Sequence, residues 1–168
     1  MASAVGASAT PSPLPSATGT WTPAPTDAPE GPVTAAPLPT TSATIDEPVE
    51  FDNGVTVAIV NVEATTVTAE TPGEVSGDAV VVTLSVTNGS TESINLDAAV
   101  VNLTADDDGY GVGTTAGEPL PFGGDLAAGE TAEGRYVFML DSAATRTVTI
   151  IVNYGAGEPV AVFEGKAF

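Results

Sequence analysis

Residues 78–89 read Asp-Ala-Val-Val-Val-Thr-Leu-Ser-Val-Thr-Asn-Gly, and this stretch decides the fold class. Every second residue from position 80 to position 86 is large and apolar: Val80, Val82, Leu84 and Val86. The residues on the opposite side are mostly small and hydroxylic. Such a two-residue period is typical of a β-strand with one face in the core and the other in water. The strand should end at Asn88-Gly89-Ser90, because Asn and Gly readily adopt the positive φ angles of a tight turn.

Segments with a similar pattern recur along the rest of the chain. Besides the stretch above, the expected strands cover residues 55–62, 93–96, 99–104, 131–140, 147–154 and 159–163. Turn-forming residues separate them, and no segment shows a helical period of useful length. In the first of these strands the apolar phase shifts between Ile59 and Val60, which predicts a β-bulge. Seven to eight short strands without helices predict an all-β sandwich or barrel.

The first 48 residues have a different composition. They hold 10 of the 14 prolines, 14 Ser and Thr residues, four carboxylates and no basic residue. With so few large apolar groups, this segment cannot bury enough surface to offset its chain entropy. We therefore expect residues 1–48 to be a disordered or polyproline-like linker and residues 49–168 to fold as one domain. Trp21, the one aromatic residue of the linker, is either an idle exposed side chain or an anchor that binds a partner.

The composition excludes several classes of function. The chain carries 22 carboxylates against three basic residues, a formal net charge of −19 at pH 7. Such a surface repels phosphate backbones and anionic headgroups, so nucleic-acid binding and membrane-surface binding are not expected. The absence of Cys and His removes disulfides, thiolate metal sites and the commonest general base. No apolar run approaches the roughly 18 residues of a membrane span, and the opening residues do not form an intact signal peptide.

No pattern of catalytic residues stands out either. A glycosidase needs two carboxylates at a fixed separation in a cleft with aromatic side chains, but only Tyr110 and Phe122 fall in expected loops. A serine nucleophile would need a base, and Lys166 is the one candidate, near the end of the chain. We therefore expect a protein that is not an enzyme.

One longer motif carries a family resemblance. It runs Leu126-x-x-Gly129-Glu-Thr131-x-x-Gly134-x-x-Val137-Phe138, after Val-Thr-Asn-Gly at 86–89 and Asp-Gly-Tyr at 108–110. Over roughly residues 49–165 the chain resembles the immunoglobulin-like domains of unknown function from exported proteins and lipoproteins of Gram-positive bacteria, especially actinobacteria. These domains are relatives of a secreted mycobacterial immunoprotective antigen. The resemblance implies an antiparallel immunoglobulin-like β-sandwich outside the cytoplasm, behind a low-complexity linker, and it implies no chemistry. The family's lipid-modified Cys has no counterpart in this sequence.

One local cluster suggests a metal site. Asp106, Asp107 and Asp108 precede Gly109 in an expected loop. Ca²⁺ takes six to eight oxygen ligands, which loop carboxylates and backbone carbonyls can supply. The interpretation as a calcium site, completed by Asp97 or Asp125, competes with that of a solvated acidic turn. No other cofactor is expected.

These features together predict a non-enzymatic immunoglobulin-like module, extracellular or in the cell envelope, held on a flexible stalk. Its expected partners are proteins or cell-envelope polymers. The alternative is a structural subunit of a surface assembly or fibre, a homo-oligomer in which the N-terminal linker packs on a neighbouring subunit. Deleting residues 1–48 separates the two, because loss of oligomers supports assembly and an unchanged monomer supports the tether.

Overall fold

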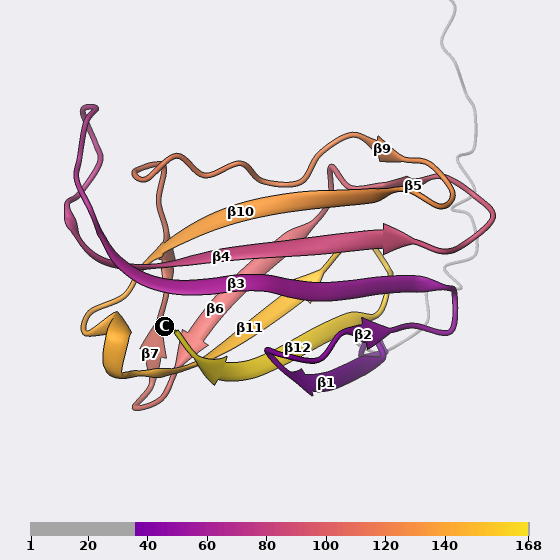
Figure 1. Ribbon diagram of the computed structural model, residues 1–168, viewed down its shortest axis with the longest axis horizontal. Coiled ribbons are helices and arrows are strands. Elements are labelled where there is room, and N and C mark those ends of the chain that lie inside the picture. The colour runs from indigo at the N-terminus through magenta and orange to yellow at the C-terminus, as the bar shows by residue number, and fades with distance from the viewer. Residues whose placement is uncertain (1–35, 168) are drawn as a thin grey trace, which may run out of the picture. The chain divides into compact units, whose positions relative to one another are not determined.

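The computed structural model describes residues 36–167 of the chain. At the centre of one sheet lies an antiparallel pair of long strands, β3 (Val55–Val67) and β4 (Gly77–Asn88) (Figure 1). The alternating stretch at 78–89 is therefore a strand, as predicted. The register between β3 and β4 shifts between Ile59 and Asn61, which confirms the predicted bulge. Both strands are rich in β-branched residues, which suit a pleated surface.

This first sheet has five strands in the order β2-β3-β4-β10-β8. The three flanking strands are β2 (Val49–Glu50), β10 (Thr131–Met139) and β8 (Val112–Gly113). β10 pairs antiparallel with β4 along its whole length, whereas β2 and β8 contribute two residues each. Because β2 is so short, most of the outer side of β3 has no neighbouring strand in the described part of the chain.

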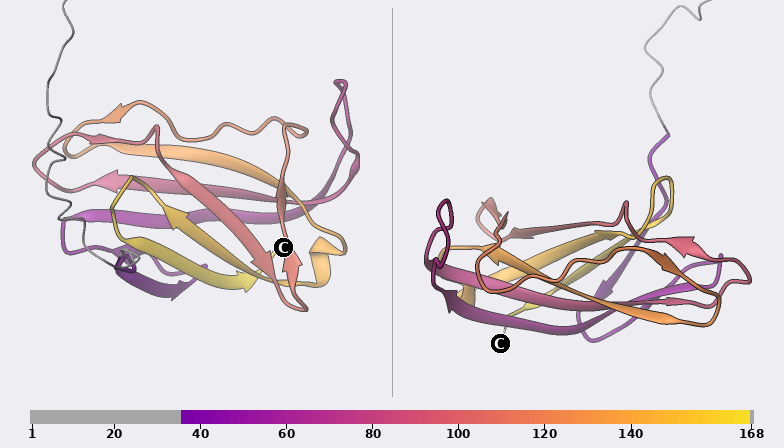
Figure 2. Two further views of the ribbon diagram at one scale, coloured as in Figure 1. Left: turned by 180° about the vertical axis from the view of Figure 1, so that it is seen from behind. Right: turned by 90° about the horizontal axis from the view of Figure 1, so that it is seen from above.

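The second sheet has the order β1-β12-β11-β6-β7. Its strands are β1 (Thr40–Thr44), β12 (Val160–Lys166), β11 (Thr147–Asn153), β6 (Val100–Ala105) and β7 (Gly109–Tyr110). A small third pair joins β5 (Ile94–Asn95) to β9 (Asp125–Leu126), and one 3₁₀ turn, η1 (Ala143–Thr145), links β10 to β11. Six of the predicted strands have five or more residues, whereas the one expected at 93–96 is the two-residue β5. Seen from behind and from above, the two large sheets form two layers (Figure 2).

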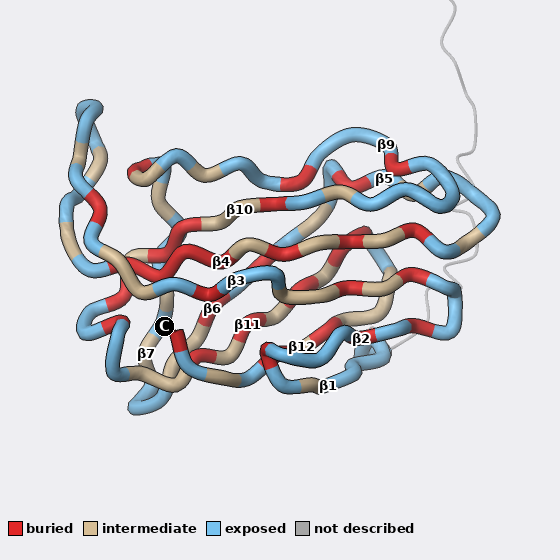
Figure 3. The backbone as a smooth tube through the Cα atoms, in the orientation of Figure 1, coloured by how far each residue is buried: buried red, intermediate tan, exposed pale blue. Residues whose placement is uncertain are grey.

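The core lies between these layers. The side chains that the alternation placed inside are fully buried, with no exposed area: Val80, Val82, Leu84 and Val86. They belong to one cluster with Val148, Ile150, Val152 and Phe163 of the second sheet. Buried residues lie mainly along the central strands, and exposed ones along the turns at both ends (Figure 3). Burying a side chain of this size stabilises a fold by roughly 1.5–3 kcal/mol. This cluster therefore makes the main favourable contribution to the free energy of folding.

The outer face of β4 is covered at one end, which the alternation did not predict. Val81 of β4 and Val137 of β10 are 5% and 2% exposed. They form a second small cluster with Ala116, which belongs to the segment between β8 and β9. Ala116 and Gly117 lie over the outer face at this end, and the rest of the segment follows the edge of β10 through a bridge between Leu120 and Arg135. The outer-face residues of β4 from Thr83 to Thr87 are partly exposed.

The domain begins earlier than the expected boundary at residue 49. β1 covers Thr40–Thr44 and pairs in parallel with β12, from Thr40 opposite Val160 to Thr44 opposite Glu164. These residues were expected in the linker because they belong to the segment rich in Pro, Ser and Thr, with few large apolar groups. Their side chains are indeed mostly exposed, and backbone pairing rather than core burial holds them in the sheet. Among the strands of residues 36–167, β1 and β12 form the one parallel pair, and all other pairs are antiparallel.

Candidate functional site

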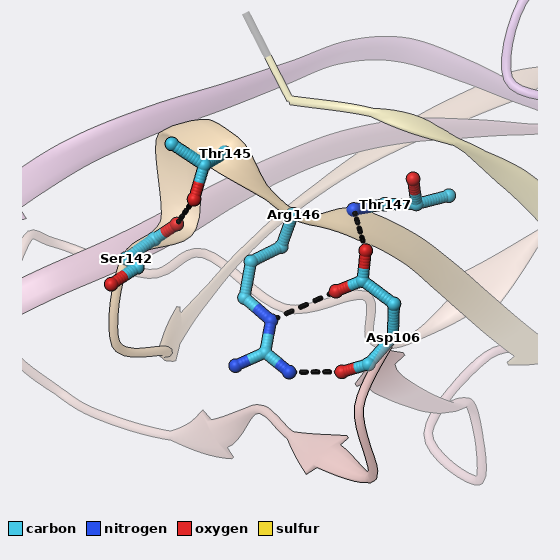
Figure 4. Close-up of polar contacts among 5 residues, drawn as sticks. All are labelled: Asp106, Ser142, Thr145, Arg146 and Thr147. Atoms are coloured by element: carbon cyan, nitrogen blue, oxygen red, sulfur yellow. Dashed lines mark hydrogen bonds and ion pairs between the residues drawn. The ribbon is translucent and has the colours of Figure 1, made fainter.

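Asp106, in the acidic turn between β6 and β7, forms an ion pair with Arg146. The Nε of Arg146 lies 2.9 Å from Oδ1 of Asp106, and the Arg146 guanidinium also donates to the Asp106 carbonyl. The other carboxylate oxygen of Asp106 accepts the Thr147 N–H at 3.1 Å. Figure 4 shows this arrangement, in which the Asp106 side chain connects the turn to Arg146 and to Thr147 at the start of β11.

The neighbouring carboxylates do not converge with Asp106. Asp107 and Asp108 adopt left-handed φ angles of 54° and 57° and are exposed. Asp97, after β5, accepts the Gly124 N–H at 2.7 Å, and Asp125 of β9 accepts the Asn95 amide of β5 at 2.9 Å, so both carboxylates join the β5 and β9 segments. Within residues 36–167 no three acidic side chains come together so that they could hold a metal ion. The geometry therefore does not support the predicted calcium site, and Asp106 has a structural role.

The pKa of Asp106 predicts how this ion pair responds to pH. The Thr147 N–H and then Arg146 lower the pKa of the carboxyl below its ordinary value of 3.8. A group with a lowered pKa contributes stability above its unfolded pKa and loses it as the pH falls through the folded one. We expect Asp106→Asn to lower Tm at pH 7, and the gap from the wild type to close as the pH falls below 3.8.

A matched control is available on the same turn. Asp107→Asn removes the same charge where no hydrogen bond is lost, and Asn tolerates a left-handed φ, so Tm should stay the same or rise. Equal losses in the two variants would contradict the structural role of Asp106. Thermal melts with added Ca²⁺ test the metal site directly, because a folded-state ligand raises Tm by mass action. A rise that Asp106→Asn abolishes would restore the calcium interpretation.

A second and larger site lies at one end of the sandwich. It is a cavity of about 560 Å³ between three loops, lined by Asn53, Val55, residues 90–95, Ala98, residues 154–156 and Glu158. The loops are the β2–β3 turn, the β4–β6 connection and the β11–β12 turn. Hydroxyl, amide and carboxylate groups line it together with a few apolar side chains, and no Lys or Arg is among its lining residues. We call this cavity the end pocket.

A polar clasp holds two of these loops together. The Asn53 amide donates to the Tyr154 hydroxyl at 2.6 Å and to the Glu158 carboxylate at 3.1 Å. The Tyr154 hydroxyl in turn donates to the same Glu158 oxygen at 2.9 Å. Burial raises the pKa of Tyr154 to about 12, so its phenol keeps its proton and remains a donor. Its ring packs against Phe51, with 5.6 Å between the ring centroids.

The third loop of the end pocket is held by Asn88, the last residue of β4. Its amide nitrogen donates to the carbonyls of Glu92 and Leu126, at 2.7 and 2.9 Å. Its amide oxygen accepts from the N–H and the hydroxyl of Ser90. This side chain is fully buried, and it is the one polar residue of the described chain that is. Asn88 thus fixes the path of residues 90–92 along the pocket wall.

The end pocket was not predicted. Composition predicted the turn at Asn88-Gly89-Ser90, and the same kind of residues form Asp52-Asn53-Gly54, but nothing local indicates that these two segments meet. Trp21, the predicted partner-binding residue, lies outside the described residues. No helix of residues 36–167 is long and apolar enough to cross a membrane.

The sandwich resembles two solved bacterial structures. MPT63, a secreted protein from Mycobacterium tuberculosis, aligns with a TM-score of 0.55 and 15% identity, over 75% of this chain and 98% of that one. A putative lipoprotein from Bacillus subtilis aligns with a TM-score of 0.56 and 16% identity, over 74% of this chain and 39% of that one. No family model matches the chain, and no curated protein matches its sequence. These likenesses confirm the β-sandwich fold that the family resemblance implied.

Proposed function

We propose that the chain is a non-enzymatic binding module of the cell exterior or envelope, and that its end pocket binds a polar envelope polymer. The end pocket is the observation that carries the proposal. It has a volume of about 560 Å³, and loops from both sheets build it. Clefts of this size that combine a few directed polar groups with apolar walls are the usual form of a ligand site.

The lining restricts the chemistry of the ligand. Glu92 and Glu158 line the end pocket, and no basic side chain balances them. An anionic polymer would therefore be repelled. Ser90, Thr91 and Asn95 offer hydroxyl and amide groups that can exchange hydrogen bonds with a polyol. These groups favour a neutral or amine-bearing polysaccharide.

The attachment of the preceding residues is consistent with such a ligand. Val160 donates its N–H to the Pro39 carbonyl at 2.8 Å, beside the β11–β12 turn that lines the end pocket. Residues 36–39 therefore lie at the pocket end of the domain. A tether attached at this point would hold the end pocket close to the surrounding polymer. The secreted protein and the putative lipoprotein with this fold support an exterior location.

Filling the end pocket should abolish polymer binding. Ala98 is exposed and lines the cavity, so Ala98→Trp places an indole in it with little effect on the core. We expect the wild type to co-sediment with insoluble Gram-positive peptidoglycan from which anionic polymers have been removed, and Ala98→Trp to stay in solution.

The control is the same substitution at the other end of β3. Ala144 is exposed on η1, and Ala144→Trp should co-sediment like the wild type. Equal binding of Ala98→Trp and the wild type would refute the end pocket as the site. Recovery of the native protein from the cytoplasm after cell fractionation would refute the location.

A further inference from the structure

The longest free strand edge of the described chain belongs to β3. On its inner side β3 pairs with β4 from Val55 to Val67, but on its outer side β2 pairs only with Thr56 and Val57. From Ala58 onward, no backbone hydrogen bond within residues 36–167 reaches that outer side. Figure 1 shows β3 as the border strand of its sheet over this length. After the bulge, the register with β4 is regular from Asn61 to Val67.

The hydrogen bonds of β4 show which peptide groups of β3 are free. Asp78 accepts the Leu140 N–H, and Asn88 donates its N–H to Glu130. The even-numbered residues of β4 therefore direct their peptide groups toward β10. In an antiparallel ladder, the residues opposite them form the pairs without mutual hydrogen bonds. Their partners on β3 direct N–H and C=O outward, and these are Val62, Ala64 and Thr66.

Two hollows flank this free edge. One of about 230 Å³ is lined by Ile45, Asp46 and residues 59–62, and one of about 350 Å³ by residues 64–66, Asp78 and residues 142–145. Their positions along β3 differ by four to five residues, or roughly 15 Å at the rise of a strand. An added strand could therefore bond its backbone to β3 and place one side chain in each hollow. Peptides that extend a sheet are recognised in this way.

The charges around the edge select the occupant. Asp46 and Asp78 line the hollows, Glu63 is exposed on β3 between them, and no Lys or Arg lines either hollow. A second copy of the chain would bring another Glu63 and another net charge of −19 to the edge. The chain's own residues 1–35 are acidic and rich in proline, which has no N–H to donate. A basic segment with free N–H groups matches the charge and the hydrogen-bonding groups of the edge, whereas a second copy and residues 1–35 do not.

We propose that the outer edge of β3 accepts a basic, extended peptide of another protein, which adds to the sheet as a further strand. Hydrogen bonds to Val62, Ala64 and Thr66 hold its backbone, and Glu63 and Asp78 attract its cationic side chains. This site is separate from the end pocket, because β3 begins at that pocket and the free edge lies along its later half. The proposal therefore stands whether or not the end pocket binds a polymer.

The test uses a short fluorescent peptide of alternating Lys and Val, with the full-length chain at low salt. Fluorescence anisotropy should show saturable binding, and a matching Glu-Val peptide should not bind. Glu63→Lys should weaken the affinity about three- to tenfold, because an exposed attraction becomes a repulsion. Glu133→Lys makes the same charge change at an exposed position of β10, away from the free edge, and should leave the affinity close to that of the wild type.

Amide hydrogen exchange measured by NMR tests the geometry. Bound Lys-Val peptide should slow exchange at Val62, Ala64 and Thr66, whereas Glu63 and Thr65 should be protected already by their bonds to β4. Absence of binding, equal weakening by Glu63→Lys and Glu133→Lys, or unchanged exchange at the three amides would overturn the proposal. The same amides could instead become protected when the protein concentration is raised without peptide, together with a dimer in light scattering. That result would overturn the proposal and assign the edge to a second copy of the chain. Ala98→Trp should bind the peptide normally, which separates this result from that for the end pocket.

Discussion

Replacing Asn88 by Ala is expected to lower the free energy of unfolding by about 2–4 kcal/mol. The Asn88 side chain is fully buried and makes four hydrogen bonds, two as donor and two as acceptor. Alanine would leave the carbonyl of Leu126 with one side-chain donor, the Ser93 hydroxyl at the longer distance of 3.3 Å, and a buried polar group that loses a partner costs about 1–3 kcal/mol. The Ser90 hydroxyl and the Glu92 carbonyl also lose a partner, but both are nearer to solvent.

Urea denaturation of the full chain measures this loss, with Asn102→Ala as the control. Asn102 is an exposed residue of β6, and its replacement should change the free energy of unfolding by less than about 0.5 kcal/mol. Asn88→Asp is a second informative variant. It keeps the acceptors but removes the donors and buries a charge, so it should destabilise at least as much as alanine. A cost for Asn88→Ala as small as that for Asn102→Ala would show that the four bonds do not hold the loop.

The fold was predictable because its signals are local. In β4 the alternation of side chains by itself states which face is buried, and the phase shift at Ile59 and Val60 located the bulge. β1 was missed for the opposite reason. Its residues Thr40–Thr44 bury almost nothing, and their place in the sheet depends on pairing with β12, more than 100 residues later in the chain. A strand held by its backbone alone leaves no pattern of apolar residues.

The sites were less predictable because their partners are distant in sequence. Three adjacent aspartates suggested a cation, but Arg146, 40 positions later, binds Asp106. In the end pocket, Asn53 contacts residues 101 and 105 positions away, Tyr154 and Glu158. Composition alone shows that each of these segments turns. Which turns meet is decided by the order of the strands in the two sheets, and a single sequence does not contain that order in readable form.

Gly89→Ala is expected to destabilise the domain by about 2–4 kcal/mol, for a steric reason. A Cβ at Gly89 would lie 2.5 Å from the Gly54 carbonyl oxygen, and that oxygen already accepts the Gly89 N–H at 3.0 Å. Gly54 has a φ of +85°. A Cβ added at Gly54 would likewise lie 3.1 Å from the Gly89 carbonyl. The Cβ at residue 89 is fixed to its own backbone and the Gly54 oxygen belongs to the other, so neither can move aside as the end of a flexible side chain would.

Two other glycines separate this clash from the ordinary cost of replacing glycine. Gly124 has a φ of +77° with open space around it, so Gly124→Ala should cost only the left-handed strain of about 1–2 kcal/mol. Gly113 has open space and no positive φ, and Gly113→Ala should be neutral within about 0.5 kcal/mol. Denaturation of the three variants should therefore give an ordered series, with Gly89→Ala the least stable. If Gly89→Ala cost no more than Gly124→Ala, the two turns would have room to separate. Asn53 and Ser90 line the end pocket and are next to Gly54 and Gly89 in the chain. The end pocket would then be a deformable site and not a preformed one.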